Sequence, residues 1–140
     1  MEIVELRSAA EHKEALPVLR ELYPWLDEGH YAALLAEMVD DGYRQFALRN
    51  EAGEVVAVAS VAVHINIYYG RYLSVYDLVV TEGERSEVYG GLLMDHVEEI
   101  GRQGCETAAL AVSLDREGAQ RLYERRGYQK PSYAMRKALG

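Results

Sequence analysis

The stretch from Tyr72 to Arg102 constrains the fold more than any other part of this chain. Residues 72–80 are mostly apolar, aromatic and β-branched, which is typical of a buried strand. After a polar link at 81–87, apolar residues recur at helical spacing, as Tyr89, Leu93, Val97 and Ile100. The pattern predicts a strand, a turn and a helix. The start of such a helix exposes backbone N–H groups and carries a partial positive charge, which suits a phosphate or pyrophosphate.

Two common phosphate-binding motifs are absent from this link. No lysine follows the glycines, so the GxxxxGK[ST] loop is excluded. Only Gly90 and Gly91 lie at the helix start, so the dinucleotide fingerprint GxGxxG is excluded as well.

The remaining patterns predict one domain over residues 1–140 with the order β-α-α-β-β-β-α-β-α-β. This is an α+β (α/β mixed sheet) fold with a mostly antiparallel sheet flanked by helices. We expect strands at 2–7, 43–49, 54–67, 72–80, 107–112 and 128–139, the fifth buried and parallel. We expect helix caps at Ser8, at Asp27 and at Ser113 or Asp115, an interruption or kink at Pro17, and a C-terminal Gly127.

Charge and cysteine content exclude several classes of protein. The net charge of −8 argues against a general nucleic-acid binder and is compatible with a cationic substrate. No apolar run approaches the ~20 residues that span a bilayer, and the acidic N-terminus does not resemble a signal peptide. The single Cys105 excludes an internal disulfide, and no histidine or cysteine cluster has metal-ligand spacing. The cytoplasm is the expected compartment.

Two segments resemble the GNAT superfamily of N-acetyltransferases. Residues 85–90, RSEVYG, follow the strand end Leu78-Val79-Val80 and resemble the family's acyl-CoA-binding pattern [RQ]-x-x-G-x-[GA], with Val88 in place of the middle glycine. Residues 119–128, AQRLYERRGY, resemble the family's A-x-x-[LF]-Y-x-x-x-G-[FY] segment, with Arg116 where an asparagine often stands. The combination of both segments is more specific than either one alone.

The resemblance implies that acetyl-CoA is the co-substrate. The edge of the strand at 77–80 would bind the pantetheine arm, the N–H of Val79 would polarise the thioester carbonyl, and the helix start would bind the pyrophosphate. The implied cofactor-binding residues are Leu78, Val79, Val80, Arg85, Ser86, Glu87, Val88, Tyr89, Gly90, Gly91, Arg116 and Ala119. No metal is implied.

Two residues are candidates for acid–base catalysis. The resemblance implies that Tyr123 donates a proton to the CoA thiolate, although helical spacing alone would make it a core aromatic. Asp77 interrupts an apolar strand and is the candidate base, with a structural carboxylate as the alternative. His64 and Glu82 are weaker choices. Aromatic residues that could line the acceptor site, or simply pack, are Tyr23, Trp25, Tyr31, Tyr68 and Tyr69.

The expected activity is direct transfer of an acetyl group from acetyl-CoA to a primary amine, either a small molecule or a peptide. A non-catalytic acyl-CoA sensor or interaction domain on the same fold is the alternative, and a purely structural partner domain is a third possibility. Neither nucleic acid nor a membrane is expected as a partner. An edge strand near the C-terminus could support a homodimer.

Overall fold

The computed structural model describes residues 1–84 and 87–140. Its internal contacts group the chain into two compact units, Met1–Leu110 and Ala111–Gly140, which are described in turn.

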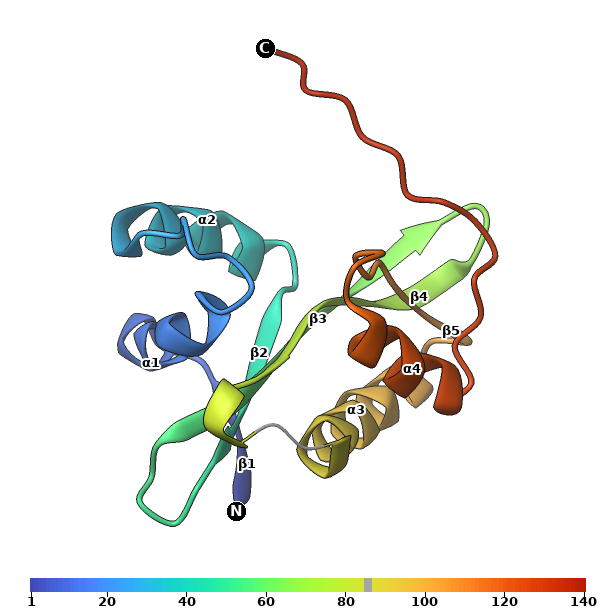
Figure 1. Ribbon diagram of the computed structural model, residues 1–140. Helices are drawn as coiled ribbons and strands as arrows, with labels where there is room; N and C mark the ends of the chain where they lie inside the picture. Colours follow the sequence, from blue (N-terminus) through green and yellow to red (C-terminus); the bar gives the residue numbers. More distant parts are fainter. Residues whose placement is uncertain (85–86) are drawn as a thin grey trace. The chain divides into compact units, whose positions relative to one another are not determined.

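The first unit is built on a five-stranded mixed sheet (Figure 1). Its elements are β1 (Glu2–Leu6), α1 (Ala9–Leu19), α2 (Glu28–Asp40), β2 (Arg44–Arg49), β3 (Val55–Asn66), β4 (Gly70–Val80), η1 (Glu82–Glu84), α3 (Glu87–Arg102) and β5 (Thr107–Leu110). The strands lie in sequence order, with β1 to β4 antiparallel and β5 parallel to β4. The predicted fold class is confirmed.

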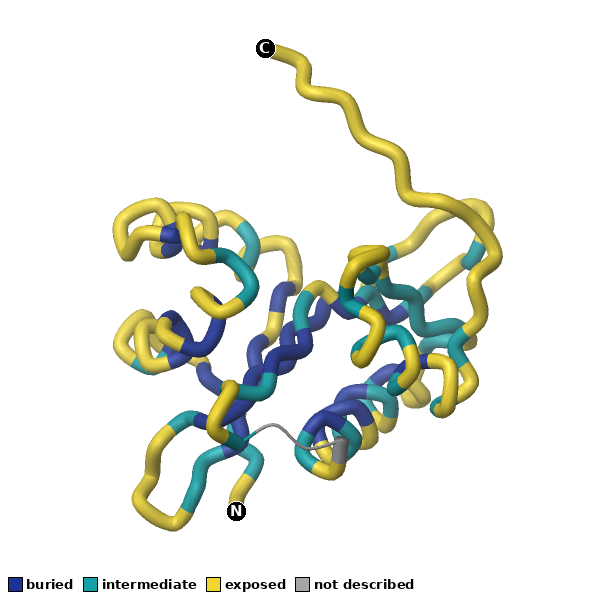
Figure 2. The backbone as a smooth tube through the Cα atoms, viewed as in Figure 1, coloured by how far each residue is buried: buried dark blue, intermediate teal, exposed yellow. Residues whose placement is uncertain are grey.

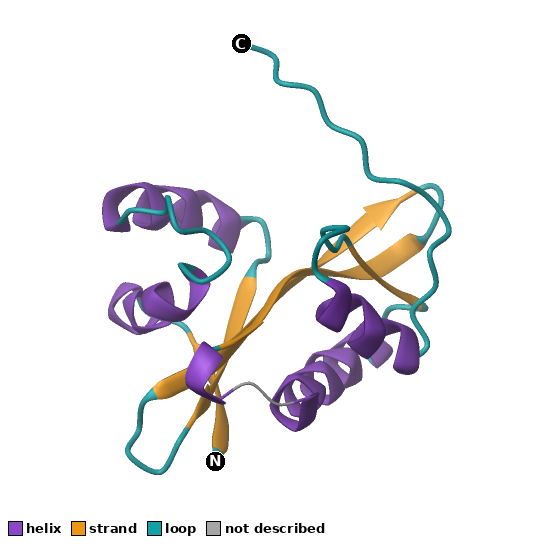
Figure 3. Ribbon diagram, in the orientation of Figure 1, coloured by secondary structure: helices purple, strands orange, loops and turns teal. Residues whose placement is uncertain are grey.

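Helices cover both faces of this sheet (Figure 3). On one face, Leu16 and Leu19 of α1 and Leu35 of α2 are buried with Val58 and Val79 of the sheet. On the other face lies α3, whose inner side is fully buried at Leu93, Met94 and Val97. The buried residues therefore follow the central strands and the inner sides of the helices (Figure 2).

The packing of α3 against the sheet is close at two places. The ring of Phe46 on β2 contacts the His96 ring, with centroids 4.9 Å apart. A Cβ atom at Gly101 would lie 3.2 Å from the Cβ of Leu73 on β4, so only glycine permits this approach without a shift. The helix that follows β4 is thereby fixed along the strand.

The N-terminal caps of the first two helices are confirmed. The Ser8 hydroxyl accepts from the Glu11 N–H at 3.1 Å, and the Glu11 carboxylate accepts from the Ser8 N–H at 3.0 Å, which completes a capping box. Asp27 caps α2 by accepting from the His30 N–H. The interruption expected at Pro17 is wrong, because α1 continues to Leu19.

The long hairpin of β3 and β4 contains an irregularity that the sequence did not show. Ser60 pairs with Asp77, but the next residue, Val61, pairs with Val75. Tyr76 is therefore an extra residue in β4, which is the definition of a β-bulge. Bulges bend a strand and change the direction of its side chains, so this one sets the orientation of Asp77.

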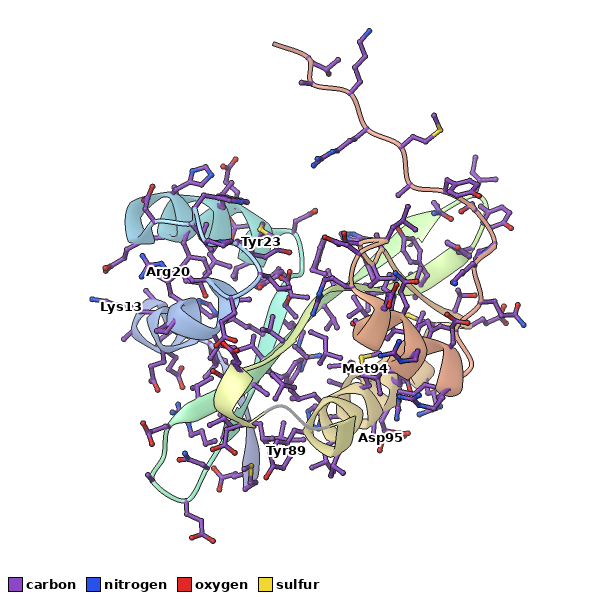
Figure 4. The ribbon with its side chains drawn as sticks, in the orientation of Figure 1. Lys13, Arg20, Tyr23, Tyr89, Met94 and Asp95 are labelled. Atoms are coloured by element: carbon purple, nitrogen blue, oxygen red, sulfur yellow. The ribbon has the colours of Figure 1, made fainter. Side chains whose placement is uncertain are left out.

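The link between β4 and α3 is held by a side chain from the loop between α1 and α2. Glu21 accepts from the Thr81 hydroxyl at 2.5 Å and from the Glu82 N–H at 2.9 Å. Residues Glu82–Glu84 form the short 3-10 helix η1. The loop at 20–26 is itself braced by Arg20, whose Nε donates to the Leu26 carbonyl at 2.8 Å (Figure 4).

The second unit contains the helix α4 (Glu117–Arg125). Gly127 follows it with φ of +95°, the left-handed conformation expected at a helix C-terminus. The predicted cap is wrong: Arg116 occupies the N-cap position without a side-chain capping bond, and Ser113 donates to Asp115 instead.

Two strand predictions near the C-terminus also need correction. β5 ends at Leu110 rather than at residue 112, and it is half-buried rather than buried. Residues 129–140 form no strand and are exposed, so the predicted last strand is absent. Pro131 has no N–H to donate to a ladder, which explains part of this result. Within the described residues, no helix is long and apolar enough to cross a membrane.

Candidate active site

One edge of β4 has no paired strand beyond the bulge, within the described part of the chain. β5 pairs with β4 only over Tyr72–Val75, opposite Thr107–Leu110. β4 continues to Val80 and pairs there with β3 on its other side. In the part of the chain that the structure describes, no further strand joins the edge of β4 beyond Val75.

The register shows which backbone groups face this open edge. The Thr81 N–H donates to the Val56 carbonyl at 2.8 Å, toward β3. Backbone groups alternate in direction along an antiparallel strand. The N–H groups of Val79 and Asp77 therefore also face β3, and the N–H of Leu78 faces the open edge. The N–H available to a ligand at this position is therefore that of Leu78. The expected role of the Val79 N–H, polarising the thioester carbonyl, does not fit this register, because that N–H faces β3.

Asp77 lies on the sheet face that α1 covers, at the end of a polar network that enters the core. Its carboxylate accepts from the Ser60 hydroxyl at 2.7 Å and from the hydroxyl of Tyr23, in the loop between α1 and α2. Figure 4 shows Tyr23 at that loop. A half-buried carboxylate is thus stabilised by two hydroxyl donors, which keeps it in a defined position.

The network continues from Ser60 into the core through three more side chains. These are Tyr31 of α2, Gln45 of β2 and Tyr43, which directly precedes β2. The Gln45 amide donates to the hydroxyl oxygens of Tyr31 at 3.0 Å and Tyr43 at 3.1 Å. The Tyr31 hydroxyl donates to the His12 carbonyl at 2.7 Å. We call these residues, together with Tyr23, Ser60 and Asp77, the Asp77 network. Gln45 and Ser60 are fully buried, so the hydrogen bonds that each of them makes within the network matter for stability.

Two tyrosines of the network, Tyr31 and Tyr43, have raised pKa values. Burial raises the pKa of Tyr43 well above its ordinary value, and the negative charge of Asp77 adds to the increase, while hydrogen bonds from Ser60 and Gln45 oppose it. Burial also raises the pKa of Tyr31, and Asp77 again contributes. Both tyrosines therefore remain protonated near neutral pH.

These shifts predict an alkaline loss of stability. A tyrosine with a raised pKa binds its proton more tightly in the folded chain, so its contribution is complete below the unfolded pKa of about 10 and falls as pH rises above it. We expect the free energy of unfolding, measured by denaturant titration, to decline between about pH 10 and pH 12. In Tyr43→Phe the decline should be shallower, whereas an equally steep decline would contradict this role of Tyr43.

The start of α3 lies next to the open edge in sequence. Arg85, Ser86 and the side chain of Glu87 fall outside the described part of the chain. Val88 is 65% exposed, so the residue in the place of the family's glycine does not fill a packed space. Gly90 is buried, Gly91 is half-buried, and Tyr89 is half-buried on the first turn (Figure 4). The described part of this helix start fits an anionic ligand.

In the second unit, Tyr123 lies on α4 and is 7% exposed. Its ring contacts that of Tyr128, with centroids 5.8 Å apart. Ala119 is half-buried on the same helix, and Arg116 precedes it.

The weaker candidates take other positions. His64 Nε2 bonds the Tyr76 hydroxyl at 2.6 Å, and Glu82 is exposed beside Glu21. Of the proposed acceptor-lining aromatics, Tyr23 contacts Asp77, Tyr31 is buried within the network, and the other three lie in loops. Within residues 1–84 and 87–140 no group of three or more potential ligands could hold a metal ion.

Sequence reasoning missed Ser60, Gln45 and Tyr43. The available signal was that Ser60 is the single polar residue between Val55 and Val63, and that Gln45 directly precedes the apolar run Phe46-Ala47-Leu48. Each has to find a partner when buried. Which partner each finds depends on the strand register, which the sequence alone does not supply.

The fold is that of known acetyltransferases. An acetyltransferase of Trypanosoma brucei superposes with a TM-score of 0.79 and 22% identity over 99% of this chain and all of that one. The aminoglycoside N-acetyltransferase AAC(6')-Iy, in complex with CoA, superposes with a TM-score of 0.84 and 14% identity over 99% of this chain and 93% of that one.

Sequence comparison gives the family. The model of the acetyltransferase (GNAT) family matches residues 6–128. An uncharacterized N-acetyltransferase of Bacillus subtilis, YhdJ, is 32% identical over 138 residues, which cover 96% of each chain. The chain belongs to the GNAT family of acetyltransferases.

Proposed function

We propose that this protein transfers the acetyl group of acetyl-CoA directly to a primary amine. The observation that carries the proposal is the open edge of β4, where the N–H and carbonyl of Leu78 face away from β3 immediately beyond a bulge. Membership of the family and the AAC(6')-Iy complex with CoA support acetyl-CoA as the donor.

The described residues fit this donor. The backbone of Leu78 provides one donor and one acceptor for the amides of the pantetheine arm. The N–H groups of Val88 to Gly91, at the positive end of α3, would hold the pyrophosphate. Val88 is exposed, so its side chain does not pack into the space beside that helix start. Acetyl-CoA, when bound, supplies an activated acetyl group.

The chain's own residues would then move two protons. A primary amine has a pKa of about 10.4 and is protonated at neutral pH, so it must lose a proton before it can react. Asp77 is positioned to accept this proton, either directly or through water, because Tyr23 and Ser60 fix its carboxylate. As the C–N bond forms and the C–S bond breaks, Tyr123 would donate its proton to the departing thiolate. The nitrogen would release its second proton to solvent, and Tyr123 would regain a proton from solvent, so that the products are the amide and CoA thiol. For Tyr123 the support is its place in the family motif and its burial on α4.

Binding of acetyl-CoA is the first test. We expect calorimetry to give a dissociation constant in the micromolar range, which is typical for enzyme substrates. Val88→Glu should weaken binding about 10-fold, because a negative charge on the first turn of α3 repels the pyrophosphate. Leu92→Glu, one turn further along the same helix and also exposed, is the matched control and should have a smaller effect.

Catalysis is the second test. Release of free thiol from acetyl-CoA should depend on an added primary amine. No binding of acetyl-CoA at high micromolar concentration would overturn the proposal. Tight binding without thiol release across a panel of polyamines, amino acids, aminoglycosides and peptide N-termini would instead indicate a non-catalytic acyl-CoA sensor.

A further inference from the structure

A row of rings extends from the Asp77 network along the β3–β4 hairpin. Tyr43 contacts Tyr76 with centroids 5.6 Å apart, and Tyr76 contacts His64 at 6.1 Å. His64 contacts Tyr72 at 6.2 Å, and Tyr72 contacts Tyr69 at 5.2 Å. We call these five residues the aromatic strip.

The aromatic strip lies on the same face of the sheet as Asp77. Side chains alternate along a strand, so Val58, Ser60 and His64 on β3 share the face that α1 covers. His64 is the direct cross-strand partner of Tyr72. Tyr76 is the bulge residue next to Asp77, and the residue is 39% exposed. A ligand whose reacting nitrogen lies at Asp77 would therefore have the strip beside it.

The two faces of the hairpin have different chemistry. The strip consists of tyrosines and a histidine, so every ring carries a polar atom. The alternate residues of β3, Val63 and Ile65, are aliphatic and point to the opposite face, where they are 39% and 66% exposed. A hydrocarbon ligand would favour that opposite face, whereas the strip favours a polar or charged ligand.

The charges near the strip indicate the sign of that ligand. Asp77 lies at one end of the strip. Asp41 lies close enough to Tyr76 that its charge adds to the effect of burial in raising the pKa of that phenol. Arg71 pairs with Ile65 and lies on the α3 side, where a Cβ at Gly104 would be 3.7 Å from its Cδ. Carboxylates and the negative faces of aromatic rings both attract ammonium groups.

The geometry points to a linear aliphatic diamine or polyamine as the acceptor, with its reacting nitrogen at Asp77 and a second ammonium over the rings of Tyr76 and Tyr72. This inference rests on the proposed function, since it assumes that Asp77 marks the reacting end. The strip would contribute affinity through cation–π contacts, and the separation of the two nitrogens would decide which amines are preferred.

Asp77 and Tyr72 pair with Ser60 and His64, which are four residues apart on β3, so the two ends of the ligand lie about 13 Å apart. The test therefore compares 1,8-diaminooctane with n-octylamine, which has the same carbon chain but lacks the second ammonium. We expect KM for the diamine to be about 5-fold lower, and calorimetric affinity to differ by the same factor. Tyr72→Leu should bring the two amines to nearly equal affinity, whereas Tyr72→Phe, which keeps the ring face, should retain the difference. Ile65→Ala on the opposite face is the matched control and should leave the difference unchanged.

The outcomes separate this inference from the proposed function. Tyr69→Leu, at the end of the hairpin, is a second variant that should reduce the preference if Tyr72→Leu does not fold. Equal affinity for the two amines in the unmodified chain, or a preference that survives both leucine variants, would overturn the inference. Selective binding of the diamine that depends on Tyr72, without any acetyl transfer, would support the strip and overturn the activity.

Discussion

Replacing Tyr123 with phenylalanine should lower kcat by about 100-fold, since a positioned general acid typically contributes 10²- to 10⁴-fold. A tyrosine phenol in water has a pKa of about 10, above the pKa of about 8.5 of a thiol, so a tyrosine is protonated at neutral pH and can serve as the acid for a thiolate. The ring would still fill its buried position on α4. The affinity for acetyl-CoA, measured by calorimetry, should therefore remain near that of the original chain.

Tyr128 offers a matched control for this experiment. Its ring contacts that of Tyr123, so Tyr128→Phe removes one hydroxyl from the same pair of rings. We expect kcat of Tyr128→Phe to change by less than about 3-fold, because its hydroxyl has no assigned part in proton transfer. If Tyr123→Phe and Tyr128→Phe have equal turnover, Tyr123 is a packing residue and the assignment as general acid is wrong.

Asp77→Asn should lower kcat/KM for the amine by about 100-fold at pH 7, because the variant cannot accept a proton. The loss should become smaller as the pH approaches the amine pKa of about 10.4, where the solvent already supplies the neutral amine. The substitution should also lower the pKa of Tyr43, since the charge of Asp77 contributes to its increase. Ultraviolet titration of the tyrosines would measure this second effect.

Glu82→Gln is the comparison variant for Asp77→Asn. It removes a carboxylate that is exposed and lies just beyond the end of β4, so it tests the other acidic candidate at low structural cost. We expect little change in kcat/KM. A large effect of Glu82→Gln together with a small effect of Asp77→Asn would reassign the base and leave Asp77 as a structural carboxylate.

Periodicity and capping predicted most of the first unit correctly. The capping box at Ser8, the Asp27 cap and the strand–helix pair of β4 and α3 depend on local patterns that the sequence displays directly. The failed predictions depend on partners. A last strand was expected at 128–139, with Pro131 inside it, but a strand forms only when another strand pairs with it, and no strand forms there.

The candidate site shows the same division. The motifs predicted which residues would form the site, and Asp77 was conspicuous as a polar residue in an apolar strand. The bulge at Tyr76, which places Asp77 opposite Ser60, arises from the register of two strands and has no local signature. The contact between Tyr23 and Asp77 joins residues 54 positions apart, so only the tertiary structure could reveal it.

The loop between α1 and α2 contacts residues at both of the proposed substrate sites, through two residues that are nearly adjacent in sequence. Tyr23 bonds Asp77, where the amine is proposed to react, and Glu21 bonds the residues that lead to the start of α3. A shift of this loop on binding one substrate would therefore alter the affinity for the other. Thermodynamic linkage requires that influence to be reciprocal. If bound acetyl-CoA changes the affinity for the amine by some factor, the bound amine changes the affinity for acetyl-CoA by the same factor.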